Sequence, residues 1–274
     1  MKFSIICLLA ATTASVAAAP SEERDLVLDK SPLDALDAVS EYFNMLAHKV
    51  HTYKHLGTAP PCNPAQAVLP SSELPGVSSG LSLVHIAVGR GTQNYTCATS
   101  DSSSVPKAAG AVAGLFNSTC SSTLHPDLNT AIPKVAVHFA LNDWRALDKH
   151  QLSPTGLKSS GLHYFQPINS TASAPFFTLD HIGLGSAQFA VNSTTPAPAT
   201  AATGQLGEKA VAWLKLLPRS DSSPAAFEEI YRVNTVGGSP PSTCEGLEAK
   251  FTVEYAAEYW FFGRLASSRS EGEL

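Results

Sequence analysis

The sequence lacks several patterns that would place it in a common class of protein. It has no C-x-x-C pair and no H-E-x-x-H motif, two arrangements that hold zinc in many proteins. Beyond its first residues, no stretch reaches the roughly 18 consecutive apolar residues of a membrane-spanning helix. Positive charge is also scarce, because 18 lysines and arginines stand against 23 acidic residues and form no basic cluster. We therefore expect neither a transmembrane segment nor a nucleic-acid partner.

The first residues have the pattern of a secretory signal peptide. Lys2 gives a short positive region, residues 3–10 (FSIICLLA) are apolar, and small residues follow. Val16 and Ala18 occupy the spacing that signal peptidase prefers, which predicts residues 1–18 as the signal and cleavage after Ala18. We expect the mature chain to be secreted, either free outside the cell or held in the cell wall.

The cysteine and asparagine patterns agree with export. Cys7 lies within the signal, and the other four of the five cysteines can form two disulfides in an oxidising compartment. Their spacing leaves three connectivities open among Cys62, Cys97, Cys120 and Cys244. Candidate N-glycosylation triplets begin at Asn94, Asn117, Asn169 and Asn192. These patterns predict a disulfide-bonded glycoprotein.

One amphipathic helix is predicted near the mature N-terminus. Ser31 suits the helix cap, Pro32 the first helical position and Asp34 the first turn. Over residues 32–55, helical spacing gives an apolar stripe of Leu36, Val39, Phe43, Leu46 and Val50. The chain is then divided into a leader with this helix, a Pro-rich linker, a β-rich domain and a polar tail, at 19–57, 58–68, 69–263 and 264–274.

Residues 69–263 are predicted to form a single mainly-β domain. Residues 250–255 alternate polar and apolar side chains, which is the period of a half-buried strand. Gly89–Gly91 is expected to form a hairpin turn between strands 81–88 and 92–98. Many short strands separated by turns favour a sandwich or a barrel. Further strand candidates are 161–167, 175–180, 186–192, 210–217 and 228–236.

Two glycine motifs resemble known sites but lack the context that those sites need. Residues 76–80 (GVSSG) match G-x-S-x-G, yet a Pro-rich stretch rather than a strand precedes them, so we interpret them as a linker. Residues 89–94 (GRGTQN) begin like a dinucleotide fingerprint, but the third glycine and the following helix are missing. No cofactor is therefore expected.

The histidines give weaker signals. His48, His51 and His55 share one face of the predicted helix, and imidazoles at this spacing can bind zinc or copper. We prefer to interpret them as solvent-exposed histidines without a metal. His85 lies in an apolar strand, where we expect it to be buried and hydrogen-bonded.

A polar cluster is predicted around Arg232. On a strand, Arg232 and Asn234 would share a face with Ile230 and Val236, so the guanidinium should leave bulk water and need acceptors. We favour an internal salt bridge with a carboxylate such as Glu254 over a ligand anion. The candidate cluster, either structural or ligand-binding, contains Arg232, Asn234, Glu254 and His163.

Within residues 69–262 the chain contains, in this order, LSLVHIAVGRGTQNYTC, GAVAGLFNSTC, GLHYFQPI, APFFTLD, AVAWLKL, IYRVNTVGGSPPSTC and VEYAAEYWFF. Together these segments resemble a family of exported fungal proteins with bacterial relatives, catalogued as a domain of unknown function. Bacterial relatives keep counterparts of Cys97 and Cys244 alone. The resemblance therefore implies the pairs Cys97–Cys244 and Cys62–Cys120, with Cys97–Cys120 as the alternative. Some members carry a malate dehydrogenase label, which the missing fingerprint and the predicted export argue against here.

Three hypotheses about function follow. The leading one is a secreted, non-enzymatic glycoprotein of the cell surface, the wall or a host interface, with a wall polysaccharide or surface protein as partner. A small-ligand or metal-binding module would need a preformed cavity in the β domain. A secreted hydrolase would need one cleft that gathers several of His163, Asp180, His181, Tyr231, Arg232 and Glu254. The sequence identifies no substrate and no catalytic residue.

Overall fold

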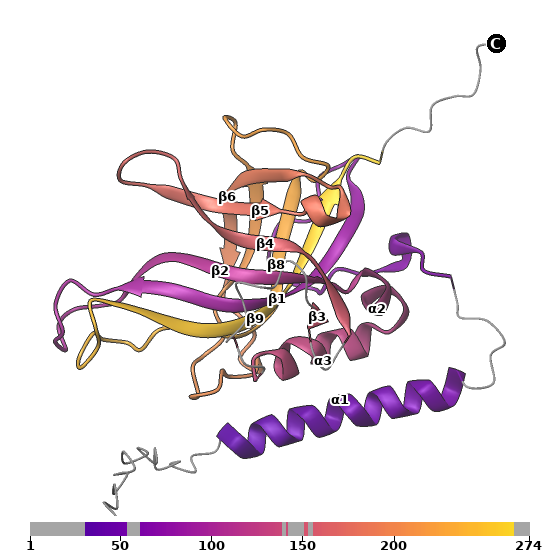
Figure 1. Cartoon of the computed structure of the whole chain (residues 1–274), viewed down its shortest axis with the longest axis horizontal. Helices are drawn as coiled ribbons and strands as arrows, with labels where there is room; N and C mark the ends of the chain where they lie inside the picture. The colour runs from indigo at the N-terminus through magenta and orange to yellow at the C-terminus, as the bar shows by residue number, and fades with distance from the viewer. Residues whose placement is uncertain (1–30, 54–60, 139–140, 142–150, 153–155, 266–274) are drawn as a thin grey trace, which may run out of the picture.

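The protein is a closed antiparallel β-barrel with helices and a long loop packed on its outside (Figure 1). The structure is a computed structural model that describes residues 31–53, 61–138, 141, 151–152 and 156–265. Its strands form one antiparallel sheet in the order β2-β1-β9-β8-β7-β6-β5-β4-β3, and β2 also pairs with β4. This last pairing closes all the strands except β3 into a barrel. The expected mainly-β, barrel-like domain with a preceding helix is confirmed.

The elements follow one another along the chain in short steps. The strands are β1 (Ser82–Thr96), β2 (Lys107–Asn117), β3 (Gln151–Leu152), β4 (Leu157–Pro167), β5 (Ser173–Thr178), β6 (Ser186–Thr195), β7 (Trp213–Pro218), β8 (Glu229–Gly237) and β9 (Lys250–Gly263). The helices are α1 (Ser31–Tyr53), α2 (Thr119–Leu124) and α3 (Pro126–Ala136), with 3-10 turns η1 (Pro64–Gln66) and η3 (Asp180–Ile182). Within the described ranges, no helix is both long and apolar enough to cross a membrane.

The hairpin expected at Gly89–Gly91 is wrong, because β1 continues through these residues as one strand. Along this stretch β1 pairs with both β2 and β9. The glycines provide space rather than a turn. A Cβ at Gly89 would lie 2.5 Å from the Tyr259 ring, and one at Gly91 would lie 1.9 Å from the Val112 carbonyl oxygen. Tyr259 can therefore lie across the inner face of β1.

Alternation along the strands divides the side chains between the barrel interior and its outer face. On β9, Tyr255 and Tyr259 belong to the interior cluster, whereas Trp260 and Phe262 belong to an outer one. Large aromatic side chains fill the middle of the interior, among them the fully buried Phe177, Phe189, Tyr259 and Phe261. An interior filled by side chains is the packing expected of a barrel with this number of strands.

Two layers cover the outer face of the barrel. On one side α3 packs against the strands, and α1 packs on α3 (Figure 1). Another part of the outer face is covered by residues 67–81, whose Leu74 is buried there. In this segment, the backbone N–H and the hydroxyl of Ser78 both donate to the carboxylate of Glu229. The GVSSG stretch is therefore a loop fixed to the barrel, and not a free linker.

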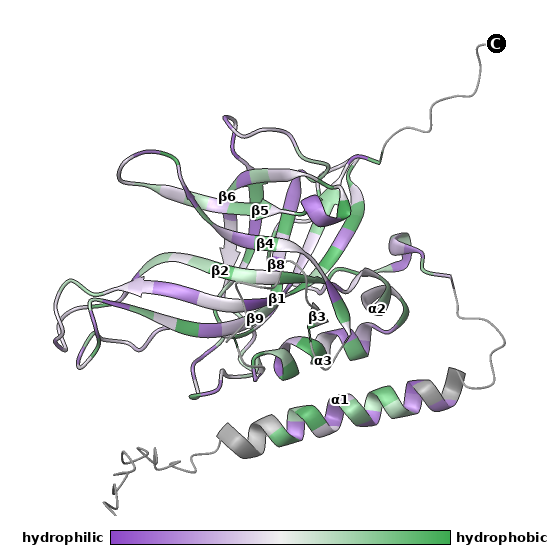
Figure 2. Ribbon diagram, viewed as in Figure 1, coloured by the Kyte–Doolittle hydropathy of each residue, from purple (hydrophilic) through white to green (hydrophobic). Residues whose placement is uncertain are grey.

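The predicted helix is present as α1, but its buried face is only partly the expected one. Tyr42, which lies outside the predicted stripe, is buried in the cluster that α1 shares with α3. Leu36 and Phe43, which were expected on the buried face, are exposed. Hydrophobic and hydrophilic residues alternate along the helix (Figure 2). Since α1 packs on another helix rather than on the sheet, a narrower strip of its surface is covered.

Two disulfides connect segments that are distant in sequence. Cys97, next to β1, is bonded to Cys244 in the β8–β9 loop, with a sequence separation of 147. Cys62 is bonded to Cys120 of α2, with a separation of 58. These are the pairs that the family resemblance implied, and the alternative Cys97–Cys120 pair is not formed.

The two disulfides should differ in how much they stabilise the fold. In the entropic model, Cys97→Ala/Cys244→Ala should lower the free energy of unfolding by about 5 kcal/mol, and Cys62→Ala/Cys120→Ala, with its shorter loop, by about 4 kcal/mol. Urea denaturation of each variant, with the other disulfide intact, measures both losses. A larger loss in the Cys62–Cys120 variant would contradict this expectation, as would a Cys97–Cys120 peptide in a non-reducing digest.

Candidate functional site

The barrel has an opening at the end where β2 and β4 separate. Their pairing runs from Phe116 and Ser159 to Val112 and Tyr164, and beyond it the start of β2 diverges from the end of β4. A cavity of about 590 Å³ lies there, which we call the barrel-mouth cavity. It is lined by Gln93, Ala108–Ala111, His163, Phe165, Thr171–Ser173, Pro175, Phe177, Val191, Leu214, Leu216, Arg232 and Tyr259.

Apolar residues form the larger part of the lining of the barrel-mouth cavity, polar atoms provide about half of its surface, and small residues create its space. Residues 108–111 of β2 read Ala-Ala-Gly-Ala, so one wall carries no large side chain. Gly110 has a φ of 126°, and a Cβ there would lie 3.1 Å from the Phe165 ring. Phe177 and Leu216 contribute apolar surface from β5 and β7. Among the described lining residues there is no Asp or Glu, so the cavity suits a guest that combines an apolar part with groups that form hydrogen bonds.

Arg232 is the cation of this cavity, and its expected salt bridge with Glu254 is not formed. On β8, Ile230 and Arg232 face inward, while Tyr231 and Val233 belong to an outer cluster. The Arg232 side chain is 8% exposed, and its Nη2 donates to the Ala212 carbonyl at 2.9 Å. Its Nε has no hydrogen-bond partner, and none of the ion pairs in the described part of the chain involves this residue.

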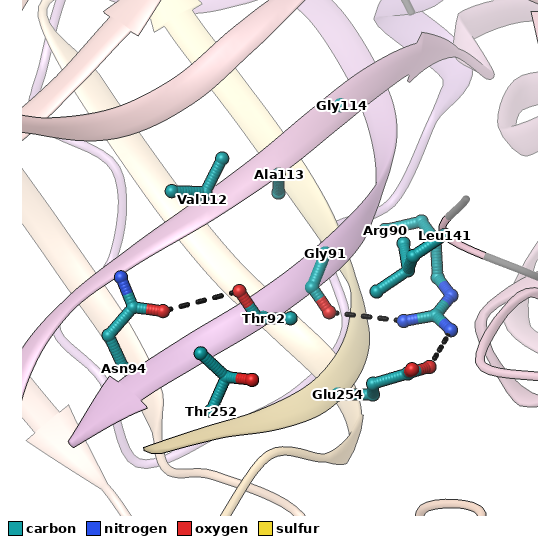
Figure 3. A pocket seen from close by; sticks show the side chains of 10 residues that line it. All are labelled: Arg90, Gly91, Thr92, Asn94, Val112, Ala113, Gly114, Leu141, Thr252 and Glu254. Carbon is teal, nitrogen blue, oxygen red and sulfur yellow. Dashed lines mark hydrogen bonds and ion pairs between the residues drawn. The ribbon is translucent and has the colours of Figure 1, made fainter. Parts of the chain in front are cut away.

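Glu254 is unable to reach Arg232 because its side chain lies on the outer face of β9. There it pairs with Arg90 of β1, whose Nη2 donates to Glu254 Oε2 (Figure 3). Arg90 Nη1 also donates to the Gly91 carbonyl at 3.0 Å (Figure 3), and Gln205 Nε2 donates to the same carboxylate at 2.9 Å. These groups border a second, separate cavity of about 440 Å³. The acid expected at Arg232 thus neutralises a different arginine.

His163, a predicted member of the cluster, does line the cavity with Arg232. It is buried on β4, stacked on Phe177 with ring centroids 4.1 Å apart, and its Nδ1 lies 3.0 Å from the Phe176 carbonyl oxygen. Burial, against the opposing effect of the hydrogen bond to the Phe176 carbonyl and together with the nearby Arg232 charge, lowers the pKa of His163 to about 4. At neutral pH the ring is therefore uncharged. Because Nδ1 must donate to the carbonyl, Nε2 is left as an acceptor.

Further polar groups line or adjoin the same cavity. The hydroxyls of Tyr255 and Tyr259 are 2.8 Å apart in the barrel interior. Burial raises the pKa of both tyrosines, whereas the nearby Arg232 charge lowers it. Gln93 of β1 lines the cavity, and its buried Nε2 has no hydrogen-bond partner. Arg232 Nε and Gln93 Nε2 thus have no partner at hydrogen-bonding distance, although the Arg232 side chain lies beside the Tyr259 hydroxyl and that of Gln93 beside the Tyr255 hydroxyl.

Asn234 does not share the inward face of Arg232, contrary to expectation. It has a φ of 47° at a register shift between β8 and β9, and asparagine tolerates this left-handed conformation better than most residues. Its Nδ2 donates to Glu258 Oε1 at 2.9 Å, and Trp260 Nε1 donates to Glu258 Oε2 at 2.8 Å. Burial raises the pKa of Glu258, and these hydrogen bonds lower it. Asn234 is thus part of a second buried polar group, outside the cavity.

Sequence reasoning missed a buried ion pair on the outer face. Lys215 of β7 and Glu229 of β8 are both buried, with Nζ and Oε2 3.1 Å apart. Lys215 also donates to the Gly76 carbonyl at 2.7 Å, beneath the loop formed by residues 67–81. Lys215 interrupts an otherwise apolar strand pattern, and this interruption was the signal available in the sequence, whereas Glu229 follows Glu228 at the start of its strand and gives no such signal.

The residues proposed for hydrolysis are not gathered in one cleft. Asp180 and His181 lie on the exposed turn η3, where the Asp180 carboxylate accepts hydroxyl hydrogen bonds from Thr178 and Ser186. Tyr231 faces outward, and its hydroxyl donates to the Pro75 carbonyl at 2.8 Å. Of this set, His163 and Arg232 alone line the barrel-mouth cavity.

The histidine expectations have separate outcomes. His85 is buried and hydrogen-bonded as expected, with ring nitrogens 2.9 Å from Ser160 Oγ and 3.0 Å from Thr119 Oγ1. His48 and His51 lie exposed on α1, while His55 falls outside the described residues. Over the part of the chain that the structure describes, no three His, Cys, Asp or Glu side chains gather as metal ligands.

Comparison with known proteins gives one family match. A family profile described as "Protein of unknown function (DUF3455)" matches residues 77–263, which is more than half of the chain. The match begins within the loop that covers the barrel and ends with β9, so it contains every strand and leaves α1 outside. No curated protein and no solved structure matches this chain.

Removing the buried cations of β7 and β8, one at a time, should change the free energy of unfolding by different amounts. Arg232→Met removes a charge that has no carboxylate partner, so the free energy of unfolding should change by no more than about 1 kcal/mol. Lys215→Met leaves the Glu229 carboxylate buried without its cation and should cost about 3–5 kcal/mol. Urea denaturation of both variants measures the difference. Equal losses would mean that Arg232 is as important to the fold as Lys215.

The free energy of unfolding should also fall at low pH, because His163 can be protonated in the unfolded chain but stays neutral where it is buried in the folded one. Its pKa is about 4 in the folded protein, against an ordinary value of 6.5. Between these values the unfolded chain binds a proton that the folded chain excludes. The contribution is therefore present above pH 6.5 and is lost as the pH falls toward 4, by up to about 3 kcal/mol.

His163→Asn keeps a donor for the Phe176 carbonyl but does not titrate, so its free energy of unfolding should fall less steeply over the same pH range. Urea denaturation at several pH values between 4 and 7 compares the two slopes. Identical slopes for the wild type and His163→Asn would contradict the burial of a neutral imidazole at this position.

Proposed function

We propose that this chain, which belongs to the DUF3455 family of proteins of unknown function, is an exported glycoprotein that binds a small apolar molecule in its barrel-mouth cavity. The observation that carries the proposal is the cavity, about 590 Å³ in volume, which is lined mostly by apolar residues with several polar groups among them. Concave apolar sites of this size with a few polar groups are typical of small-ligand binding. Barrels of this strand number can hold one small ligand. The small-ligand module, one of the alternatives drawn from the sequence, therefore becomes the preferred form of the exported glycoprotein, ahead of a surface, wall or host-directed protein without a ligand.

Export is supported by the signal pattern at residues 1–18 and by the two disulfides, which are typical of oxidising compartments. Glycosylation is supported at three of the four acceptors, because Asn117, Asn169 and Asn192 are exposed. Asn94 is half-buried within β1, which makes it the least accessible acceptor.

Binding is favoured over hydrolysis by the groups that meet in the cavity. His163 is held by the Phe176 carbonyl and stacked on Phe177, which fixes a neutral ring. Arg232 contributes a fixed positive charge. Asp180, His181 and Glu254 lie elsewhere, so the described lining has no carboxylate to act with the imidazole. A cation, a neutral acceptor and apolar walls recognise a ligand more readily than they activate water.

The proposal predicts binding of an apolar probe by the secreted protein. The chain is expressed in a eukaryotic secretory host, where the mature N-terminus should be Ala19 and N-glycosidase treatment should lower the mass. N-Phenyl-1-naphthylamine should then bind with a dissociation constant in the micromolar range, and its fluorescence should rise because the dye leaves water for an apolar cavity. Fluorescence titration measures the constant.

Two matched substitutions locate the bound probe. Ala111→Phe puts a ring into the barrel-mouth cavity and should abolish the fluorescence rise, whereas Ala190→Phe adds the same ring on an exposed part of β6 and should leave it unchanged. Circular dichroism checks that both variants are folded. Absence of probe binding to the folded wild type, or equal binding by both variants, would reject the cavity as the site.

A further inference from the structure

Arg232 is the one charged group among the described residues that line the barrel-mouth cavity, since His163 is neutral at pH 7. A guanidinium has five N–H donors and stays ionised in proteins. Here one donor is satisfied by the Ala212 carbonyl, the Tyr259 hydroxyl lies beside the guanidinium, and Nε has no partner. A buried cation in this state is unfavourable unless an acceptor is supplied from outside the chain.

The fold satisfies its other buried cations with carboxylates. Lys215, on the neighbouring strand, is 3.1 Å from the Glu229 carboxylate and also donates to a backbone carbonyl. Arg90, on the outer face of β1, is paired with Glu254. Arg232 is therefore distinguished by its position inside the cavity, where the described lining has no acid.

A second unsatisfied donor belongs to the same cavity. The buried Nε2 of Gln93 on β1 has no hydrogen-bond partner, and Gln93 lies close enough to the Tyr255 hydroxyl to lower its pKa, against the larger effect of burial. Tyr259 also lines the cavity. It lies on β9, the strand that separates β1 from β8 in the sheet. Two donors without acceptors, on strands flanking β9, predict a ligand group that only accepts hydrogen bonds.

The geometry points to an apolar organic acid as the ligand, and we propose that its carboxylate binds Arg232 and Gln93 while its apolar body lies against Phe177, Leu216 and Phe165. A carboxylate accepts two parallel hydrogen bonds from a guanidinium, which Nε and a neighbouring N–H can supply. One negative charge matches the single positive charge, whereas a doubly charged phosphate would leave one charge uncompensated in an apolar site. This inference rests on the proposed function and names the chemical class of its ligand.

Decanoate and 1-decanol test the inference, because they share a chain length and differ in the charge of the head group. Isothermal titration calorimetry at pH 7 should show that the wild type binds decanoate about 10- to 100-fold more tightly than decanol, the range expected for hydrogen bonds to a charged group. Arg232→Met should reduce decanoate binding to the level of decanol and leave decanol binding unchanged. Arg219→Met, which removes an arginine outside the cavity, should keep the preference.

Two further variants keep the test independent of the folding of Arg232→Met. Arg232→Lys retains the charge but loses the bidentate fork, so the preference for decanoate should become smaller without disappearing. Gln93→Leu removes the second donor and should weaken decanoate binding about 10-fold or more, the value of one hydrogen bond to a charged group. Circular dichroism spectra of all variants should match that of the wild type.

The possible failures of the inference and of the proposed function have different signatures. Equal binding of decanoate and decanol, with both lost in Ala111→Phe, would overturn the organic-acid ligand and leave the cavity as an apolar binding site. A preference for decanoate that survives Arg232→Met would also overturn the inference, because another residue would then bind the carboxylate. If neither decanoate, decanol nor N-phenyl-1-naphthylamine bound the folded wild type, the proposed function would fail together with the inference.

Discussion

Closure of the barrel through the β2–β4 pairing is the constraint on which the rest of the structure depends. A closed sheet has a single inner face, and alternation assigns each strand residue either to that face or to the outside. Aromatic side chains such as Phe177, Phe189 and Phe261 occupy the middle of the interior. The start of β2 has only alanine and glycine in residues 108–111, and there β2 no longer pairs with β4. The same closure that buries the core therefore leaves one end of the interior open.

The two buried cations of β7 and β8 show how the free energy of a charged side chain depends on whether it faces the inside or the outside of the barrel. Lys215 faces outward and is covered by the loop of residues 67–81. It pairs there with Glu229 of β8 and donates to the Gly76 carbonyl of the loop. Arg232 faces inward, opposite Leu214 in the pairing of β7 and β8, where it meets the Ala212 carbonyl and the Tyr259 hydroxyl but no carboxylate. The Lys215–Glu229 ion pair holds this loop on the barrel, whereas a buried cation without a carboxylate, such as Arg232, destabilises the fold. Local departures of this kind from the rules of stability are concentrated at functional sites.

Sequence patterns located Arg232 correctly on an inward strand face with Ile230, but they selected the wrong partner. Glu254 lies on β9, the strand next to β8, but the residue of β9 that pairs with Arg232 is Tyr259, so Glu254 is also displaced along the strand. The pleat places Glu254 on the outer face, where Arg90 is available. Asn234 leaves the shared face for a similar reason, because a bulge at this residue changes the register between the two strands. Alternation gives the side of one strand, while the partner depends on the register between strands.

By itself, the sequence determined the mainly-β class, most strand positions, the preceding helix and the expectation of two disulfides, because these depend on local period, on turn residues and on cysteine number. Tertiary structure alone decided that β1 passes through Gly89 and Gly91, since the space they provide is needed by Tyr259 and by the β2 backbone. It also decided that His163 and Arg232 meet in one cavity, although β4 and β8 are far apart in sequence. A cavity exists only where strands from the whole chain close around it, and no local pattern contains that closure.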